Sequence, residues 1–128
     1  MSYTFSRTIE SGFDEAVRRA TAALQAEGFG VLTEIDVQKT LKAKLGVDFR
    51  RYLILGACNP GLAHQALQAE DNIGAMLPCN VVVQEREGGK VDISAVDPVA
   101  SMQAIDNPTL GKVAAEVQAK LKAVVDTL

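Results

Sequence analysis

The sequence predicts an α+β fold in which an antiparallel β-sheet carries two long helices on one face. Amphipathic helical patterns occur near both ends of the chain, at about residues 12–27 and 108–124. Several strand-like segments lie between them, and one, residues 52–57, is apolar at nearly every position. Strands grouped between two helices favour an α+β layer with the helices segregated to one side of the sheet.

The composition is that of a globular protein, with 48% apolar and 23% charged residues. A length of 128 residues predicts a single domain over residues 1–128. The net charge of −3 argues against a general binder of nucleic acids or anionic membranes. The chain has no apolar run near the roughly 18 residues that cross a bilayer. Because residues 1–5 do not resemble a signal peptide, we expect a cytoplasmic location.

The first strand and the first long helix are predicted at the N-terminus. Residues 3–8 alternate in the manner of a short strand. Ser11 is the expected helix cap, with Asp14 completing a variant of the capping box. Gly28 is expected to end the helix. The predicted buried stripe comprises Phe13, Val17, Ala20 and Leu24.

A second strand and a short helix are predicted next. Phe29, Val31 and Ile35 alternate and are expected on one side of this strand. Asp36 should cap the short helix, which should close at Gly46. Its predicted buried stripe is Val37, Leu41 and Leu45.

The apolar run from Tyr52 to Ala57 predicts a central strand that is covered on both faces. Helices would cover one face, and a partner subunit is the expected cover for the other. Asn59 can cap the next helix, and Pro60 fits its first position because that N–H is not needed there. The predicted buried residues of this helix are Ala63, Ala66 and Leu67, packed against the sheet.

A hairpin is predicted around Gly88-Gly89, between strands at residues 81–85 and 91–96. A three-residue loop, Gly88 to Lys90, keeps the apolar residues on one face, whereas a two-residue loop would mix the faces. This register pairs Glu85 with Ile93, Val83 with Ala95 and Arg86 with Asp92. Cys79 then shares the inward face with Val81 and Val83.

The last long helix has clear start signals. Asn107 is its expected cap, and Pro108 is expected at its first position. The predicted buried stripe is Leu110, Val113, Val117, Leu121 and Val124.

Two Cys-Asn pairs mark the candidate site. The segment 57–60 (Ala-Cys-Asn-Pro) ends a strand and enters a helix, and the segment 78–81 (Pro-Cys-Asn-Val) starts another strand. At such ends, backbone amides and helix termini can reach a ligand. We therefore expect a ligand site formed by Cys58, Asn59, Cys79 and Asn80. The two cysteines should lie close without a disulfide, since cytoplasmic thiols stay reduced.

The middle of the chain also resembles a known family. The motifs concerned are Ile35-Asp36-Val37, Thr40-Leu41-Lys42, Leu45-Gly46, the segment 54–60 and the segment 77–83. Together they resemble the bacterial family catalogued as "domain of unknown function 302", most strongly between about Ile35 and Pro98. The resemblance implies a β-α-β4-α arrangement similar to the TATA-binding-protein fold, with extra short helices, and a homodimer. It implies no activity, and a shared fold class does not transfer DNA binding.

The single histidine and the basic residues give weaker signals. Cys58, Cys79 and His64 are suitable metal ligands, but they lack the short spacings of metal motifs and His64 points away from the apolar helix face, so no metal is predicted. A basic stretch comprises Lys39, Lys42, Lys44, Arg50 and Arg51. It could attract an anionic ligand, but a solvated helix face is the favoured interpretation. Phosphate-loop, GxSxG and HExxH motifs are absent from the sequence.

Three functional hypotheses follow. The first is a dimeric module that binds a small molecule or an ion at the two Cys-Asn segments. The second is a thiol-dependent enzyme or redox sensor, because the start of a helix can stabilise the Cys58 thiolate. The opposing interpretation makes Cys58 a small apolar filler. The third is a structural dimer without its own chemistry. Neither a cofactor nor a reaction is specified by the sequence.

Overall fold

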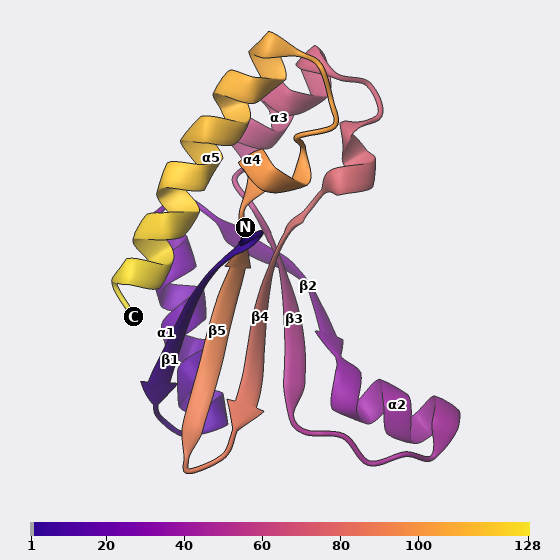
Figure 1. The fold of residues 1–128 in the computed structure, drawn as a ribbon, viewed down its shortest axis with the longest axis vertical. Coiled ribbons are helices and arrows are strands. Elements are labelled where there is room, and N and C mark those ends of the chain that lie inside the picture. Colours follow the sequence, from indigo (N-terminus) through magenta and orange to yellow (C-terminus); the bar gives the residue numbers. More distant parts are fainter. Residues whose placement is uncertain (1) are drawn as a thin grey trace.

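The computed structural model describes residues 2–128 and is built on one five-stranded antiparallel sheet (Figure 1). The strand order across the sheet is β1-β5-β4-β3-β2. The strands are β1 (Thr4–Glu10), β2 (Gly30–Asp36), β3 (Tyr52–Cys58), β4 (Cys79–Arg86) and β5 (Lys90–Val96). The predicted α+β class and the antiparallel sheet are confirmed.

Two long helices, α1 (Phe13–Ala26) and α5 (Pro108–Asp126), pack against each other and against the sheet. The shorter helices are α2 (Val37–Leu45), α3 (Pro60–Ala69), the 3-10 helix η1 (Ile73–Met76) and α4 (Pro98–Ser101). Figure 1 shows α3 and α4 beside the upper part of α5, while α2 projects from the opposite end of the sheet. The sequence did not predict η1 or α4.

The core lies between the sheet and the two long helices. Alternate strand residues face these helices and are buried: Ile9, Leu55, Ala57, Cys79, Val81, Val83, Val91, Ile93 and Ala95. The predicted α5 stripe is buried at every position, and α1 buries its predicted Phe13, Ala20 and Leu24, with Ala16 in addition and Val17 only half-buried. The other side of the sheet, which we call the open face, carries a row formed by Ser6, Ser94, Val82, Ile54 and Ile35.

Three of the four predicted helix caps are confirmed. Asp36, Asn59 and Asn107 each accept a hydrogen bond from the backbone N–H three residues further along. The prediction for Ser11 is wrong, because Gly12 is the N-cap and the Ser11 hydroxyl donates to the Gly12 carbonyl at 2.9 Å. Asp14 binds the Arg51 guanidinium at 2.9 Å, in place of the predicted capping box.

A bulge in β2 overturns the predicted face of Ile35. Val31 pairs with Ala57, and Thr33 pairs with Gly56, so Leu32 is an extra residue in this strand. The extra residue reverses the alternation. Ile35 therefore lies opposite Ile54 on the open face, whereas Phe29 is buried and Val31 packs against the core.

The hairpin has a loop of the predicted length but a different register. Its three residues are Glu87, Gly88 and Gly89, and both glycines have a positive φ, 74° and 72°. The last residue of such a loop is left-handed, which suits Gly89 and does not suit Lys90. The observed pairs are Arg86 with Lys90, Glu85 with Val91, Val83 with Ile93 and Val81 with Ala95. A shift of two residues preserves the inward face, so Cys79, Val81 and Val83 are buried as expected.

The predicted buried stripe of α2 is wrong. Every residue of α2 is at least partly exposed, and Leu45 keeps 69% of its surface accessible. The cap at Asp36 and the left-handed Gly46 (φ 67°) are as predicted. Because α1 and α5 already cover the helical face of the sheet, α2 has no apolar layer to pack on and projects beyond β2 and β3 (Figure 1).

Candidate functional site

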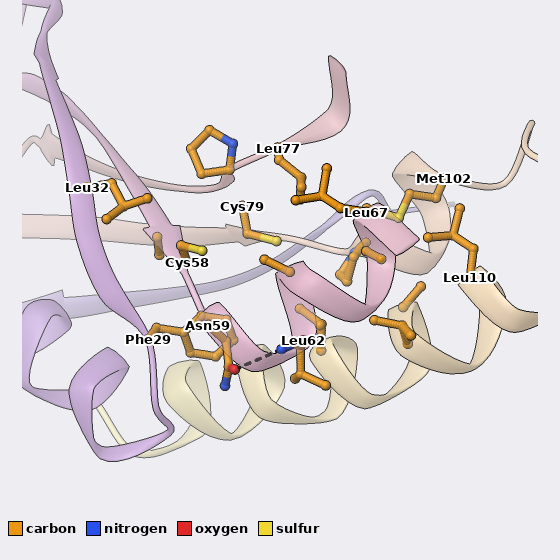
Figure 2. A pocket seen from close by; sticks show the side chains of 18 residues that line it. Phe29, Leu32, Cys58, Asn59, Leu62, Leu67, Leu77, Cys79, Met102 and Leu110 are labelled. Carbon is orange, nitrogen blue, oxygen red and sulfur yellow. Dashed lines mark hydrogen bonds between the residues drawn. The ribbon is translucent and has the colours of Figure 1, made fainter. Parts of the chain in front are cut away.

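An apolar cavity of about 290 Å³ lies where the ends of β3 and β4 meet α3 and α5 (Figure 2). Its walls come from segments far apart in the sequence: the start of β2, the two Cys-Asn segments, α3, α4 and the first half of α5. In Figure 2, Cys58 and Cys79 lie at one end of the cavity, and Leu67, Met102 and Leu110 lie at the other. Two of the lining residues, Leu32 and Leu67, are exposed, so the cavity is open to solvent.

Helix α3 forms one wall and is held by Asn59. The Asn59 side chain accepts a hydrogen bond from the Leu62 N–H at 3.3 Å (Figure 2). Pro60 occupies the first turn. Helix α3 packs on α5 rather than on the sheet, so its buried residues are Leu62 and Ala66. The prediction that Leu67 is buried is wrong, since 46% of its surface is exposed.

Small side chains keep the cavity open. Ala63 and Ala66 on α3 line it opposite Ala114 on α5. A methyl group at each of these positions leaves space that a leucine would fill. Protein interiors are normally packed as densely as organic crystals, so an open space of this size between two packed helices is a distinct feature of the molecule.

The two cysteines line the same cavity, and neither is in a disulfide. Cys79 is 7% exposed. It pairs across the sheet with Ala57, the residue that precedes Cys58. Burial raises the pKa of the Cys79 thiol to about 11, and the nearby Cys58 adds a smaller effect in the same direction. Cys58 itself is half-exposed. The expected geometry, two neighbouring unbonded thiols, is therefore present.

Only one of the two asparagines lies at the cavity. Asn59 lines the cavity and caps α3. Asn80 is exposed on β4, pairs with Gly56 across the sheet and does not line the cavity. Three of the four residues predicted for the site therefore lie together.

Gly56 lets the segment before Cys79 lie close to β3. A Cβ at this position would come within 2.1 Å of the Thr33 Oγ1 and 2.7 Å of the Pro78 ring. Real side chains do not reach these distances. A glycine is needed here so that Pro78 can pack on β3 and Cys79 can enter the cavity wall.

The three potential metal ligands considered from the sequence, Cys58, Cys79 and His64, do not come together. His64 is exposed and does not line the cavity. Within residues 2–128, no group of three potential metal-ligating side chains is found.

The basic stretch lies outside the cavity. The α2 lysines are exposed, and Lys42 pairs with Asp48 at 3.0 Å. The Arg50 guanidinium lies over the Phe49 ring, 4.4 Å from its centroid. The favoured interpretation, a solvated face, is confirmed for the lysines.

The family model described as "Domain of unknown function DUF302" matches residues 5–128. The chain belongs to the DUF302 family. It is also similar to the crystal structure of an uncharacterized conserved DUF302 protein from Bacillus stearothermophilus, with 31% identity, 98% of each chain covered and a TM-score of 0.89. A comparison with curated proteins finds no match. The resemblance drawn from the Cys-Asn motifs therefore extends over nearly the whole chain.

Some of the residues that line the cavity were not predicted from the sequence. Leu110, Val113 and Val117 were predicted only as core residues, and Met102 was not singled out. The length of the last helix is the feature of the sequence that could have indicated these residues. A helix of 19 residues spans about 28 Å, whereas a seven-residue strand spans roughly 23 Å. The first turns of α5 therefore extend past the sheet and need another cover, which α3 and α4 provide.

In the described part of this DUF302 chain, residues 2–128, none of the helices has the length and apolar character needed to cross a membrane.

Proposed function

We propose that this DUF302 protein is a small-molecule-binding module whose site is the cavity beside Cys58 and Cys79. The observation that carries the proposal is the cavity itself, about 290 Å³ and lined almost entirely by apolar side chains. An engineered apolar cavity of about 150 Å³ in another protein binds benzene, and natural ligand sites begin at about 300 Å³. The cavity thus has the size and the concave form of a site for a small ligand.

Its location supports the same proposal. The exposed lining residues Leu32 and Leu67 give a ligand access from solvent, and much of the wall comes from helices and strands, among them α3, which the Asn59 cap holds. Sites on helices and strands are held more precisely than sites on mobile loops.

The test is a fragment screen by amide NMR on the whole chain. A binding fragment should shift amide signals of α3, of the segment 77–79 and of the first half of α5. Ala114→Leu fills the cavity and should abolish these shifts, whereas Ala115→Leu, the same change at the adjacent exposed position, should not. Shifts confined to the open face or to α2 would contradict the proposed site.

We also propose that the protein is a homodimer formed through the open face. The row across this face is apolar on β4, β3 and β2 (Val82, Ile54, Ile35) and polar on β5 and β1 (Ser94, Ser6). A specific interface is expected to bury at least about 1,200 Å² in total. Ile54→Glu should shift the sedimentation equilibrium of the protein to monomer, and Ala115→Glu, at an exposed position of α5 away from the open face, should have little effect. A wild-type protein that sediments as a monomer at micromolar concentration would contradict the dimer.

The thiols support a second candidate function, a thiol-dependent enzyme or redox sensor. Two free cysteines lie beside one cavity, and Cys58 is partly exposed there. Free thiols also fit a reducing compartment, so we propose a cytoplasmic location. Cys58→Ser separates the two functions: a binding module should lose at most about a few-fold in affinity, because Cys79 and Met102 still line the cavity, whereas an enzyme should lose its thiol-dependent turnover. If no ligand binds and no thiol chemistry is found, a structural dimer is the remaining hypothesis.

A further inference from the structure

We infer that the cavity takes an uncharged aromatic molecule of roughly two fused rings and rejects the same molecule carrying a carboxylate. The inference rests on the proposed function and names the class of ligand for that site. It follows from the charge, polarity, size and sulfur content of the cavity wall.

In the part of the chain that the structure describes, the wall has no charged side chain that could pair with a charged ligand. Among the residues 2–128 that line it, none is acidic, basic or histidine. The only amide side chain is that of Asn59: its oxygen accepts the Leu62 N–H, and its Nδ2, the one amide donor among these side chains, lies beside Gly28. Moving an ionised carboxylate into such surroundings without a partner is strongly unfavourable. The anionic ligand considered from the sequence is thus a poor match for this cavity.

The behaviour of Cys79 supports the same conclusion. Its thiol lines the cavity and is almost fully buried. Burial, the larger cause, raises its pKa to about 11, which means that these surroundings disfavour a negative charge. A carboxylate placed beside this thiol would meet the same surroundings. Pro78 and Pro98, which also line the cavity, contribute no backbone N–H that could bind an anion.

The size of the cavity sets the size of the ligand. At about 290 Å³, it is roughly twice the engineered cavity that holds one benzene ring. The alanines on the facing walls of α3 and α5, Ala63, Ala66 and Ala114, make room for a rigid and flat molecule. A ligand of about two fused rings therefore fills the space.

Sulfur atoms favour an aromatic ligand over a saturated one. Cys58 and Cys79 line one end of the cavity, and Met102 lines the other (Figure 2). Polarizable sulfur makes favourable contacts with aromatic rings. Phe29 adds an aromatic ring to the wall, and aromatic pairs gain beyond the area that they bury. A saturated hydrocarbon of the same size gains from neither contact.

The test compares three ligands of nearly the same size: naphthalene, its saturated counterpart decalin, and naphthoate at neutral pH. Affinities are measured from amide NMR shifts of the whole chain. We expect naphthalene to bind about a hundredfold or more tightly than naphthoate, because the carboxylate stays unpaired in the cavity. We expect decalin to bind more weakly than naphthalene, by a few-fold to about tenfold.

Two variants and a control tie the binding to this cavity. Ala114→Leu should weaken naphthalene binding by at least about tenfold, because it occupies the ligand volume, and Ala115→Leu should leave it unchanged. If Ala114→Leu does not fold, Ala63→Leu at the half-buried wall of α3 serves the same purpose.

The outcomes separate the two proposals. Equal binding of naphthalene and naphthoate would overturn the selectivity for uncharged ligands and leave the binding function standing. Equal binding of decalin would overturn the aromatic preference. If none of the three ligands binds in the cavity, the inferred ligand class fails; the fragment screen then decides separately whether the binding function fails as well.

Discussion

The two Cys-Asn segments contain the same dipeptide and yet occupy different environments. At 57–60, Cys58 is half-exposed and Asn59 is turned inward, where it caps α3. At 78–81 the order is reversed: Cys79 is buried in the cavity wall and Asn80 is exposed on the open face. The same dipeptide is therefore oriented in opposite ways. Whether the cysteine or the asparagine points inward depends on where the dipeptide lies relative to the ends of the strand and the helix.

The difference predicts a large contrast in thiol reactivity. With a pKa of about 11, Cys79 has roughly a hundredth of the thiolate of an ordinary thiol near pH 8, and its burial blocks access as well. Cys58 is accessible. Iodoacetamide should therefore modify Cys58 at least about a hundredfold faster than Cys79, as followed by mass spectrometry. Cys58→Ser should remove the fast phase, and unfolded protein should lose the contrast. Equal rates in the folded protein would show that Cys79 is not shielded.

The same burial predicts alkaline sensitivity. The pKa of Cys79 is raised from 9.0 to about 11 in the folded state. Stability is therefore fully present below pH 9 and is lost as pH rises from 9 towards 11, because only the unfolded thiol ionises in this window.

Between about pH 8 and 10.5, the loss that Cys79 causes should be about 2 kcal/mol. It is measured by denaturant unfolding as the difference between the wild type and Cys79→Val. Parallel pH profiles of the two proteins would contradict the raised pKa. Other titrating groups cancel in this difference.

The tight approach of Pro78 to β3 predicts intolerance at Gly56. Gly56→Ala places a Cβ against Pro78 and Thr33, and such overpacking should destabilise the fold by about 1–3 kcal/mol. Gly30→Ala, on the neighbouring strand, has open space around the new Cβ and should change stability by no more than about 1 kcal/mol. Thermal unfolding of both variants measures the difference. A neutral Gly56→Ala would mean that the segment around Cys79 can move.

Alanine substitutions of the two asparagines should differ in their effect on stability, by a smaller amount than the preceding changes. Asn59→Ala removes the cap of α3 and should cost about 0.5–2 kcal/mol. Asn80→Ala changes an exposed side chain and should stay within about 0.5 kcal/mol. Chemical denaturation of the two variants side by side gives the comparison. A larger loss for Asn80 would assign it a structural contact that the fold does not show.

Local signals in the sequence predicted much of the fold. Asn59-Pro60 and Asn107-Pro108 start their helices as expected, because a cap depends on residues within one turn. The inward face of β4 followed from alternation alone, with Cys79, Val81 and Val83 all buried.

The wrong predictions concern structural features that a short stretch of sequence does not determine. Leu32 reads as an ordinary strand residue, but its bulge moves Ile35 to the open face. The hairpin register could slip by two residues because such a shift keeps the same face inward. The stripe of α3 was only partly right: Ala66 is buried as predicted, but Leu62 is buried in place of Leu67, because α3 packs on α5, a helix far along the chain.

The candidate site was half predictable for the same reason. The Cys-Asn motifs placed Cys58, Asn59 and Cys79 together, since the two segments lie at adjacent strand ends. The cavity was not predictable, because its volume depends on alanines from two helices that meet only in the folded chain. Asn80 was assigned to the site by its likeness to Asn59, and alternation along β4 turns it to the other face.

The most direct measurement of the central claim is a crystal structure of the protein grown with bromonaphthalene, in which anomalous scattering locates the bromine. We expect one bromine peak inside the cavity between α3 and α5, either beside Cys58 and Cys79 at one end or beside Met102 at the other. The peak should vanish in Ala114→Leu crystals and persist in Ala115→Leu crystals. An empty cavity in the wild-type crystals, with bromine bound only at the open face or along α2, would contradict the claim that this cavity is a ligand site.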